Sequence, residues 1–284
     1  MCAHARTGSG ALHTDDAPVL DDAAVEPILS RGSLELDGRI VSASNASFLG
    51  HVTLDGVTLR CIYKPIAGER PLWDFPPGTL AGRERAARLV SEAGCWDVVP
   101  QTVLRDGRFG PGMCQRWVDT TPSGALVDVV DVEYDEPGWL AVLQAEDQHG
   151  QPVLLVHADD DRLRAMAVFD VVVNNADRKG GHVLVESRPG GELVWGCDHG
   201  VSFHEDSKLR TVLWGWAGQP LRDTDRAALQ RLRAALTAGL DERLSEWLDD
   251  AEITALSRRL ESLCRTGQMP VPDGSWPAIP WPPF

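Results

Sequence analysis

The stretch that decides the fold, residues 161–182, reads DRLRAMAVFDVVVNNADRKGGH. Its first part, 161–174, repeats apolar residues at helical spacing behind an aspartate-rich start, and this pattern predicts a helix. Its second part, 174–182, is a polar loop with charges held between apolar elements. Placing charged side chains between two buried elements costs free energy, so such residues often have a functional role. Asp177 is therefore a candidate functional residue, and a plain solvent-exposed turn is the alternative.

Downstream, the residues around Asp198 form a second candidate. Strands are predicted at 183–186 and 193–197, joined by Pro189-Gly190-Gly191. Asp198 closes the second strand and is followed by His199-Gly200, so a carboxylate is expected at the floor of a cleft. Asp198 is one hairpin away from Asp177, which lets the two carboxylates converge on one metal–phosphate centre. A plain Asp-His-Gly turn is the alternative.

Upstream, short apolar runs from 28 to 63 are broken by the turn signals Asp37-Gly38 and Asp55-Gly56, which predicts a small antiparallel sheet. A helix is predicted at 80–94, ending at Gly94. Further strands are predicted at 98–104 and 113–118.

The rest of the chain is predicted to be mainly helical. A hairpin is expected around 147–150, and helices are expected at 223–240 and 241–265. The Pro- and Trp-rich tail, 270–284, cannot be helical and is expected to pack as an extended strap. A β-rich part followed by a helical part predicts two lobes around a cleft and not a parallel βαβ sheet.

Composition narrows the function classes. A net charge of −15 over 284 residues disfavours binding to nucleic acid or to an anionic membrane surface. No apolar run approaches the roughly 20 residues of a membrane-spanning helix. Residues 1–24 form the expected flexible tail, which lacks the apolar segment of a secretory signal. The six cysteines are irregularly spaced, which favours a reducing cytoplasm over a disulfide framework.

The candidates fit phosphoryl transfer, which needs a cation for phosphates, ligands for magnesium and a carboxylate for the acceptor hydroxyl. Lys64 ends an apolar strand, and Glu84 on the following helix offers it a partner; a solvent-facing strand-edge lysine is the alternative. The small residues of 42–47 let backbone N–H groups approach phosphate, although an ordinary hairpin loop has the same composition. Metal-hydrolase, nucleophile-elbow and P-loop motifs are absent from the sequence.

Several of these segments together resemble a known family. Residues 169–178, FDVVVNNADR, resemble the helix and catalytic loop of type II phosphatidylinositol 4-kinases, and more loosely those of the wider phosphoinositide 3-/4-kinase and HipA-like groups. Residues 197–203, CDHGVSF, resemble the metal-binding segment, and Tyr63-Lys64-Pro65 matches the nucleotide lysine. The chain is also similar to an actinobacterial phosphatidylinositol-kinase-like group. The resemblance covers about residues 40–216.

The resemblance implies an α+β, bilobal, protein-kinase-like fold: a small β-rich N-lobe (25–114), a hinge (115–118) and a mainly helical C-lobe (119–284). It implies ATP-dependent transfer of the γ-phosphate to a hydroxyl of an inositol-type small molecule, a lipid or a protein, with Mg²⁺ or Mn²⁺. Nucleic acid and integral membrane association are not expected.

The resemblance also implies residue roles. Asp177 would be the catalytic base, Lys64 would bind phosphates and pair with Glu84, and Asp198 would hold the metal. The implied nucleotide-binding residues are Ser42, Ser44, Asn45, Ser47, Gln115, Trp117 and Val118.

One position departs from the family. His182 stands where the family has the asparagine that binds the second metal. Imidazole suits softer metals than Mg²⁺. Four alternatives are therefore open: His182 binds Mn²⁺, His182 contacts phosphate, one metal ion suffices without it, or catalysis is impaired. An ATP-binding pseudokinase acting as a regulatory module is therefore the alternative function, and a non-kinase structural protein is the third.

Overall fold

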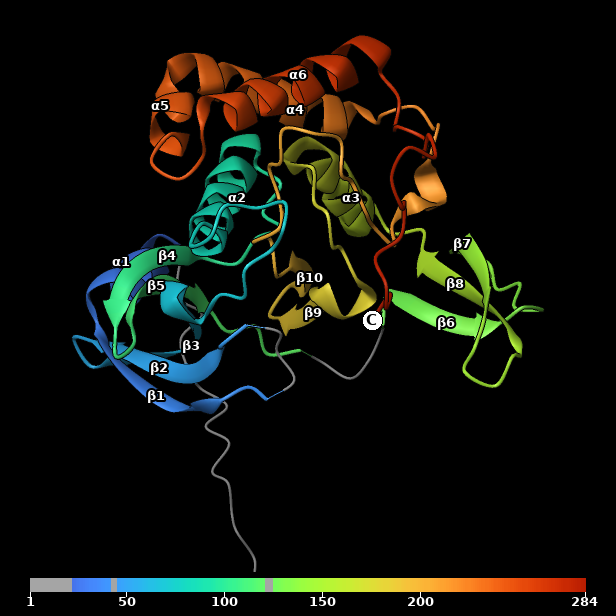
Figure 1. Cartoon of the computed structure of the whole chain (residues 1–284). Helices are drawn as coiled ribbons and strands as arrows, with labels where there is room; N and C mark the ends of the chain where they lie inside the picture. The colour runs from blue at the N-terminus through green and yellow to red at the C-terminus, as the bar shows by residue number, and fades with distance from the viewer. Residues whose placement is uncertain (1–21, 42–44, 121–124) are drawn as a thin grey trace, which may run out of the picture.

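A computed structural model describes residues 22–41, 45–120 and 125–284. The N-terminal lobe holds a five-stranded antiparallel sheet in the order β1-β2-β3-β5-β4, seen at the lower left of Figure 1. Two helices, α1 and α2, accompany it. The bounds are α1 Asp22–Arg31, β1 Ser33–Arg39, β2 Phe48–Leu54, β3 Val57–Pro65, α2 Leu80–Gly94, β4 Thr102–Gly107 and β5 Gly110–Arg116.

The start of this lobe differs from the sequence prediction in two places. Ile28 was expected to begin the sheet, but it lies in α1, where it packs with Leu29 into the core of the sheet. Asp37-Gly38 was expected to be a turn, but it lies inside β1, where a bulge shifts the register. The bulge accommodates one extra residue, Asp37, without reversing the chain. Residues 1–21 of the expected tail lie outside the described residues, and 22–24 begin α1.

The second turn signal was correct. Asp55 and Gly56 join β2 to β3 with φ values of 50° and 81°. A two-residue hairpin turn of this kind needs positive φ at both positions, which aspartate tolerates and glycine favours. The register then places Lys64 near the end of β3, on the strand that pairs with β5.

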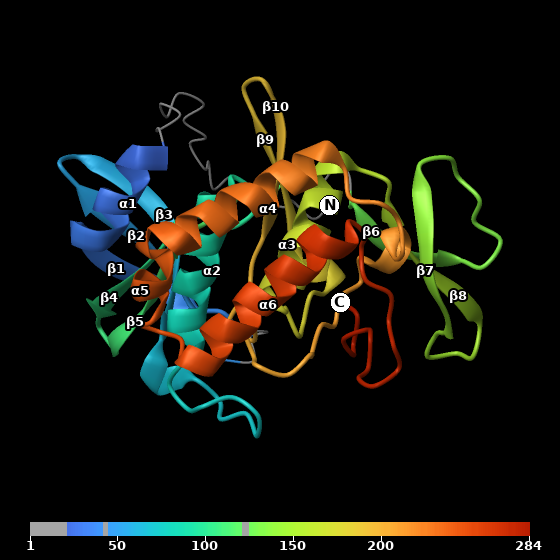
Figure 2. The same ribbon diagram turned by 90° about the horizontal axis from the view of Figure 1, so that it is seen from above.

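Helix α2 has the predicted bounds, and it ends where Cys95 takes a left-handed conformation with φ 54°. Most of its residues are buried, because it lies between the sheet and the C-terminal lobe (Figures 1 and 2). This position puts Glu84 between the lobes, where it can reach groups from both.

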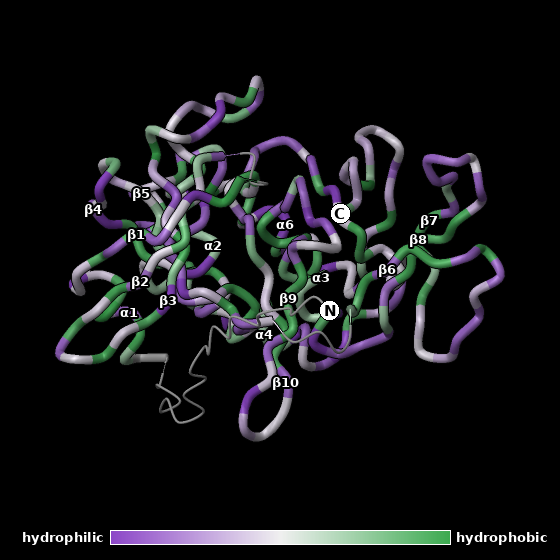
Figure 3. Tube along the Cα trace, turned by 90° about the horizontal axis from the view of Figure 1, so that it is seen from below, coloured by the Kyte–Doolittle hydropathy of each residue, from purple (hydrophilic) through white to green (hydrophobic). Residues whose placement is uncertain are grey.

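The C-terminal lobe is built around α3 (Asp161–Val173), as predicted. Seen from above in Figure 2, α4 (Asp223–Ala235) and α6 (Asp250–Thr266) lie over α2 and α3. The hairpin β9 (Val183–Arg188) and β10 (Gly191–Gly196) was also predicted. Figure 3 shows that the chain around α3 is largely hydrophobic, and α3 supplies much of the buried core.

The last helices were predicted with wrong bounds. The regular helix expected at 223–240 ends at Ala235, and a wide turn follows in which Gly239 has φ 100°. The single helix expected at 241–265 is broken after α5 (Asp241–Leu244). Asp249 restarts it by accepting the backbone N–H of Glu252, which in turn caps Asp249. The capping box thus starts a new helix at a place where the apolar periodicity alone predicts a continuous one.

A three-stranded sheet stands apart from the N-terminal sheet, at the opposite side of the molecule in Figures 1 and 2. Its hairpin, β7 (Trp139–Glu146) and β8 (Pro152–Ala158), turns at the predicted place. Its edge strand β6 (Val127–Asp131) was missed, because two of its five residues are aspartate and only Val127 is buried.

The tail beyond Gly267 contains no helix or strand and runs along the C-terminal lobe, so the expected strap is confirmed. Trp214 Nε1 donates to the carbonyl of Ala278 at 2.8 Å, and the Gly180 amide donates to the carbonyl of Pro283 at 2.8 Å. The strap therefore ends beside the loop that carries Asp177.

This order of elements, with an antiparallel sheet and one buried helix before a helical lobe, confirms the α+β, bilobal, protein-kinase-like fold class. No helix within residues 22–41, 45–120 and 125–284 has both the length and the apolar character needed to cross a bilayer.

Candidate active site

Lys64 is the centre of an ion-pair network between the lobes. Its ammonium lies 3.2 Å from Glu84 Oε1 and forms a second ion pair with Asp198 Oδ1. Burial opposes the charged ammonium, but the carboxylates of Asp198 and Glu84 outweigh it and hold the pKa of Lys64 above its usual range. A solvent-facing strand-edge lysine does not fit this geometry.

Asp198 is positioned by a strained backbone. It follows β10 with φ 58°, a left-handed conformation that few non-glycine residues adopt. The Lys64 ammonium holds the pKa of the Asp198 carboxyl well below its ordinary value, against the effect of burial. Oδ1 faces Lys64, and Oδ2 lies 3.4 Å from His182 Nε2. The carboxylate is therefore ionised and held between two lobes.

Glu84 joins the same network from α2. Its Oε2 accepts the backbone N–H of His199 at 3.0 Å, while its Oε1 faces Lys64. Burial raises the pKa of the Glu84 carboxyl, and Lys64 opposes that shift. Glu84 thus fixes the backbone directly after Asp198 as well as the ammonium.

His182 has a defined tautomer. Its Nδ1 lies 2.9 Å from the carbonyl oxygen of Asp177, which only accepts, so Nδ1 carries the proton. Burial lowers the pKa of His182 to about 4 despite the attraction of Asp198. The ring is therefore neutral, and the lone pair of Nε2 faces the Asp198 carboxylate. Such a nitrogen can ligate a metal ion.

Asp177 is held by the loop around it. Its backbone N–H donates to Asn175 Oδ1 at 3.0 Å, and Asn175 Nδ2 donates to Asp170 Oδ1 at 3.0 Å. Burial raises the pKa of the Asp177 carboxyl, and Lys179, 3.8 Å away, opposes the shift. A carboxylate with a raised pKa can accept a proton from an acceptor hydroxyl.

A cavity of about 460 Å³ lies between the lobes, and its volume is within the range of small-molecule sites. Predicted site residues that line it are Asn45, Ser47, Lys64, Glu84, Asp177, His182 and Asp198. Sequence reasoning missed Lys179, Arg70 and Glu69, which also line it. Lys179 had a usable signal, because it lies two residues after Asp177. Arg70 and Glu69 had none, because the Pro-rich loop that brings them there has no periodicity.

The predicted hinge residues do not line the cavity. Gln115 is buried, and its side chain donates to Thr102 Oγ1 at 2.7 Å; the Trp117 amide donates to the carbonyl of Arg60 at 3.0 Å. Val118 is also buried. Met113, farther back on β5, contributes to the cavity wall instead. Ser42 and Ser44 lie outside the described residues.

The metal ligands are few. In the described part of the chain, no three His, Cys, Asp or Glu side chains converge on one point. Mg²⁺ often binds through one or two protein ligands and completes its shell with substrate phosphates and water. Asp198 offers one carboxylate for such a site, whereas the neutral imidazole of His182 beside it suits softer metals than Mg²⁺.

Comparison with known proteins places the chain in a family. No protein-family model matches it. Protein Rv2133c of Mycobacterium tuberculosis is 52% identical over 268 residues, which covers 90% of this chain and 94% of that protein. The chain belongs to the Rv2133c family. Membership of the Rv2133c family shows common ancestry and does not assign a reaction.

A bacterial kinase is among the solved structures that align with most of this chain. The proinflammatory kinase CtkA of Helicobacter pylori aligns over 84% of this chain and 94% of that chain, with a TM-score of 0.44 and 10% sequence identity. The narrower resemblance of this Rv2133c-family chain to type II phosphatidylinositol 4-kinases stays a prediction.

Proposed function

We propose that this chain is an ATP-dependent phosphotransferase that moves the γ-phosphate of ATP to a hydroxyl group. The observation that supports this most is the network in which Lys64 contacts both Glu84 and Asp198, inside a cavity that also holds Asp177. Each group that phosphoryl transfer requires has a candidate in that one cavity.

The proposed roles follow from the chemistry of each side chain. Lys64 binds phosphate oxygens, and Glu84 keeps its ammonium in place. Asp198 and His182 would hold a metal ion, whose positive charge would neutralise the phosphates. Asp177 orients the acceptor hydroxyl and takes its proton. Lys179, which lines the cavity beside Asp177, adds positive charge where negative charge develops.

The test is ATP consumption and phosphate transfer with purified protein, first with Mg²⁺ and then with Mn²⁺. Asp177→Asn, Asp198→Asn and Lys64→Met should each lower the rate at least about a hundredfold, because each removes a group that acts on the transition state. Asp206→Asn is the matched control, since that carboxylate is 74% exposed and outside the cavity. A wild-type rate in Asp198→Asn would refute the metal assignment.

The acceptor is proposed only as a class. Candidates are an inositol-type small molecule, a lipid and a protein hydroxyl. Screening these three groups with γ-labelled ATP separates them, and loss of transfer in Asp177→Asn shows that any label found is enzymatic.

A second candidate function is an ATP-binding pseudokinase with a regulatory role. His182 favours it, because a neutral imidazole stands where the resemblance expects a metal-binding amide. ATP at about 100 times its dissociation constant should stabilise the protein by about 2.7 kcal/mol. A thermal shift of that size without phosphate transfer in either metal would favour the pseudokinase, and the absence of any shift would contradict both functions.

A further inference from the structure

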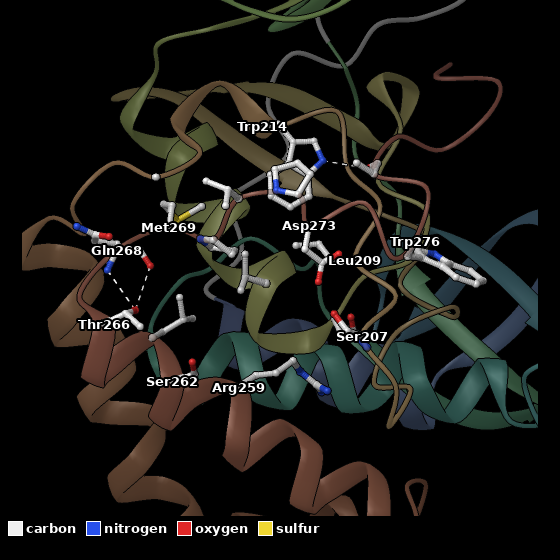
Figure 4. Close-up of a pocket in the computed structure, with 18 of the residues that line it drawn as sticks. Ser207, Leu209, Trp214, Arg259, Ser262, Thr266, Gln268, Met269, Asp273 and Trp276 are labelled. Carbon is white, nitrogen blue, oxygen red and sulfur yellow. Dashed lines mark hydrogen bonds between the residues drawn. The ribbon is translucent and has the colours of Figure 1, made fainter.

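A second cavity, of about 470 Å³, lies on the C-terminal lobe. Helix α6, the segment 207–214 and the tail 268–278 form its walls, as Figure 4 shows. None of its lining residues belongs to the candidate active site. Its volume is again that of a small-molecule site.

Most of the wall is apolar and partly aromatic. In Figure 4, Trp214 and Met269 lie across the cavity from Arg259 and Ser262 of α6, and Trp276 of the tail lies at the right of the view. The Trp214 indole is fixed by its hydrogen bond to the Ala278 carbonyl. The fixed Trp214 face favours a flat apolar body, because stacking contacts cost little side-chain entropy there. The centre of the Trp276 ring lies 5.0 Å from Lys208 Nζ, and its Nε1 has no hydrogen-bond partner in the described part of the chain.

One cation lines the cavity. Arg259 on α6 donates from Nε to the Val172 carbonyl at 2.9 Å and from Nη1 to the His204 carbonyl at 3.2 Å. Its Nη2 has no hydrogen-bond partner. Burial, and next the charge of Arg258, lower the pKa of Arg259 to about 10. The guanidinium is therefore short of negative charge and of one acceptor.

Some buried guanidinium groups of this chain have a carboxylate partner. Arg83 pairs with Glu252, and Arg178 pairs with Asp170. Arg88, which donates to the Val99 carbonyl, forms no ion pair among the residues that the structure describes and, unlike Arg259, does not line this cavity. Within the described residues, no carboxylate forms an ion pair with Arg259. A buried charge without a counter-charge is costly, and a bound anion would remove that cost.

The one carboxylate in the cavity wall does not fill this role. Asp273 is exposed on the tail and already accepts the backbone N–H of Ser275 at 2.9 Å and its hydroxyl at 2.6 Å. These hydrogen bonds keep it on the tail, whereas Arg259 is anchored to α3 and to the carbonyl of His204.

We propose that this cavity binds a small organic anion, a carboxylate or phosphate on an aromatic body, with the anionic group on Arg259 and the ring against Trp214 and Trp276. The site is separate from the phosphotransferase cavity, and its occupancy is measurable whether or not the chain transfers phosphate.

The probe is 2-naphthoate, followed by isothermal titration calorimetry with the full chain. Its neutral counterpart of the same shape, 2-naphthol, tests the charge, and inorganic phosphate tests the ring. The naphthoate should bind with one saturable site and at least about tenfold more tightly than either control, as expected for a charge-assisted hydrogen bond to guanidinium. Equal affinities for naphthoate and naphthol, or no binding of naphthoate, would overturn the proposal.

Two neighbouring arginines give a matched pair of variants. Arg259→Gln should weaken naphthoate binding at least about tenfold, whereas Arg258→Gln, which removes the same charge from an exposed position of α6 outside the cavity wall, should not. An equal loss of naphthoate affinity in both variants would show that only the net charge of the protein matters, and it would overturn the proposal.

A third variant keeps the test decisive if Arg259→Gln does not fold. Ser262→Trp retains Arg259 and fills the cavity from α6. It should abolish naphthoate binding while its circular dichroism spectrum stays that of the wild type. Undiminished binding in this folded variant would place the naphthoate elsewhere and overturn the proposal.

Discussion

Arg178 grips Asp170 with two parallel hydrogen bonds, from Nε to Oδ2 at 2.8 Å and from Nη2 to Oδ1 at 2.9 Å, and both side chains are fully buried. The same guanidinium donates to the Cys197 carbonyl at 3.0 Å and lies 2.7 Å from His199 Nε2. It therefore ties α3 to both chain segments that carry the proposed catalytic carboxylates.

Arg178→Lys should be strongly destabilising. Lysine keeps the charge but cannot make the paired contact with Asp170 or reach Cys197 at the same time. Leaving a buried carboxylate imperfectly paired costs about 3 kcal/mol or more. Urea unfolding measures the loss, and Arg31→Lys, at an exposed helix end, is the control expected to change stability by less than about 0.5 kcal/mol. Equal stability of the two variants would show that the paired geometry contributes nothing.

His182→Asn should change metal preference. The neutral Nε2 of His182 faces Asp198, and an amide oxygen in its place suits Mg²⁺ better than an imidazole does. The ratio of Mg²⁺- to Mn²⁺-supported rates should rise about tenfold, the scale of changes seen when metal-site partners are altered. Steady-state rates in both metals measure it, and His149→Asn, in an exposed turn, is the control. An unchanged ratio would contradict the proposed role of His182 as a metal ligand.

Sequence patterns singled out the main residues of the candidate site because these residues follow periodic elements. Asp177 follows a helix with a clear apolar repeat, and Asp198 follows a hairpin with clear turn residues, so both ends could be placed. Sequence patterns could not predict which residues far apart in the chain contact each other. The contacts of Glu84 with Lys64 and with the backbone of His199 join residues far apart in the chain, and helix periodicity does not reveal which acid faces the cleft.

The misses have physical causes of the same kind. The loop 65–79 brings Arg70 and Glu69 to the cavity through local contacts: the Arg70 amide donates to Asn45 Oδ1, and Glu69 accepts the amides that open α2. Such side-chain caps obey no sequence period. Helix α1 was missed because Pro27 lies inside it.

His157 should make the protein sensitive to acid. Its Nδ1 donates to the Ala158 carbonyl, its Nε2 accepts the Gly215 amide at 3.0 Å, and its ring packs on Trp216. Burial holds the pKa of His157 below its ordinary value of 6.5. Below about pH 6.5, His157 therefore binds a proton more readily in the unfolded chain than in the folded chain. The contribution of His157 to the free energy of unfolding is fully present above about pH 6.5. It falls as the pH drops, by at most about 1.4 kcal/mol per pH unit.

The measurement compares unfolding free energies from about pH 7 to about pH 5. In His157→Gln the pH slope should be smaller than in the wild type, whatever the absolute stability of the variant. His149→Gln, at an exposed position, should keep the wild-type slope. Identical slopes in all three proteins would show that His157 does not contribute to acid unfolding.

Gly180→Ala should release the end of the strap from the loop that carries Asp177. A Cβ at Gly180 would collide with the Phe284 ring, and the Gly180 amide donates to the Pro283 carbonyl at 2.8 Å. Phe284 is 49% exposed, so its ring can move away into solvent, and global stability should fall by less than about 1 kcal/mol. Hydrogen exchange of the residue-180 amide should accelerate about tenfold as its acceptor leaves. Gly181→Ala is the adjacent control, because a Cβ there meets nothing within 4 Å. If both variants exchange this amide at the wild-type rate, the strap does not restrain the loop.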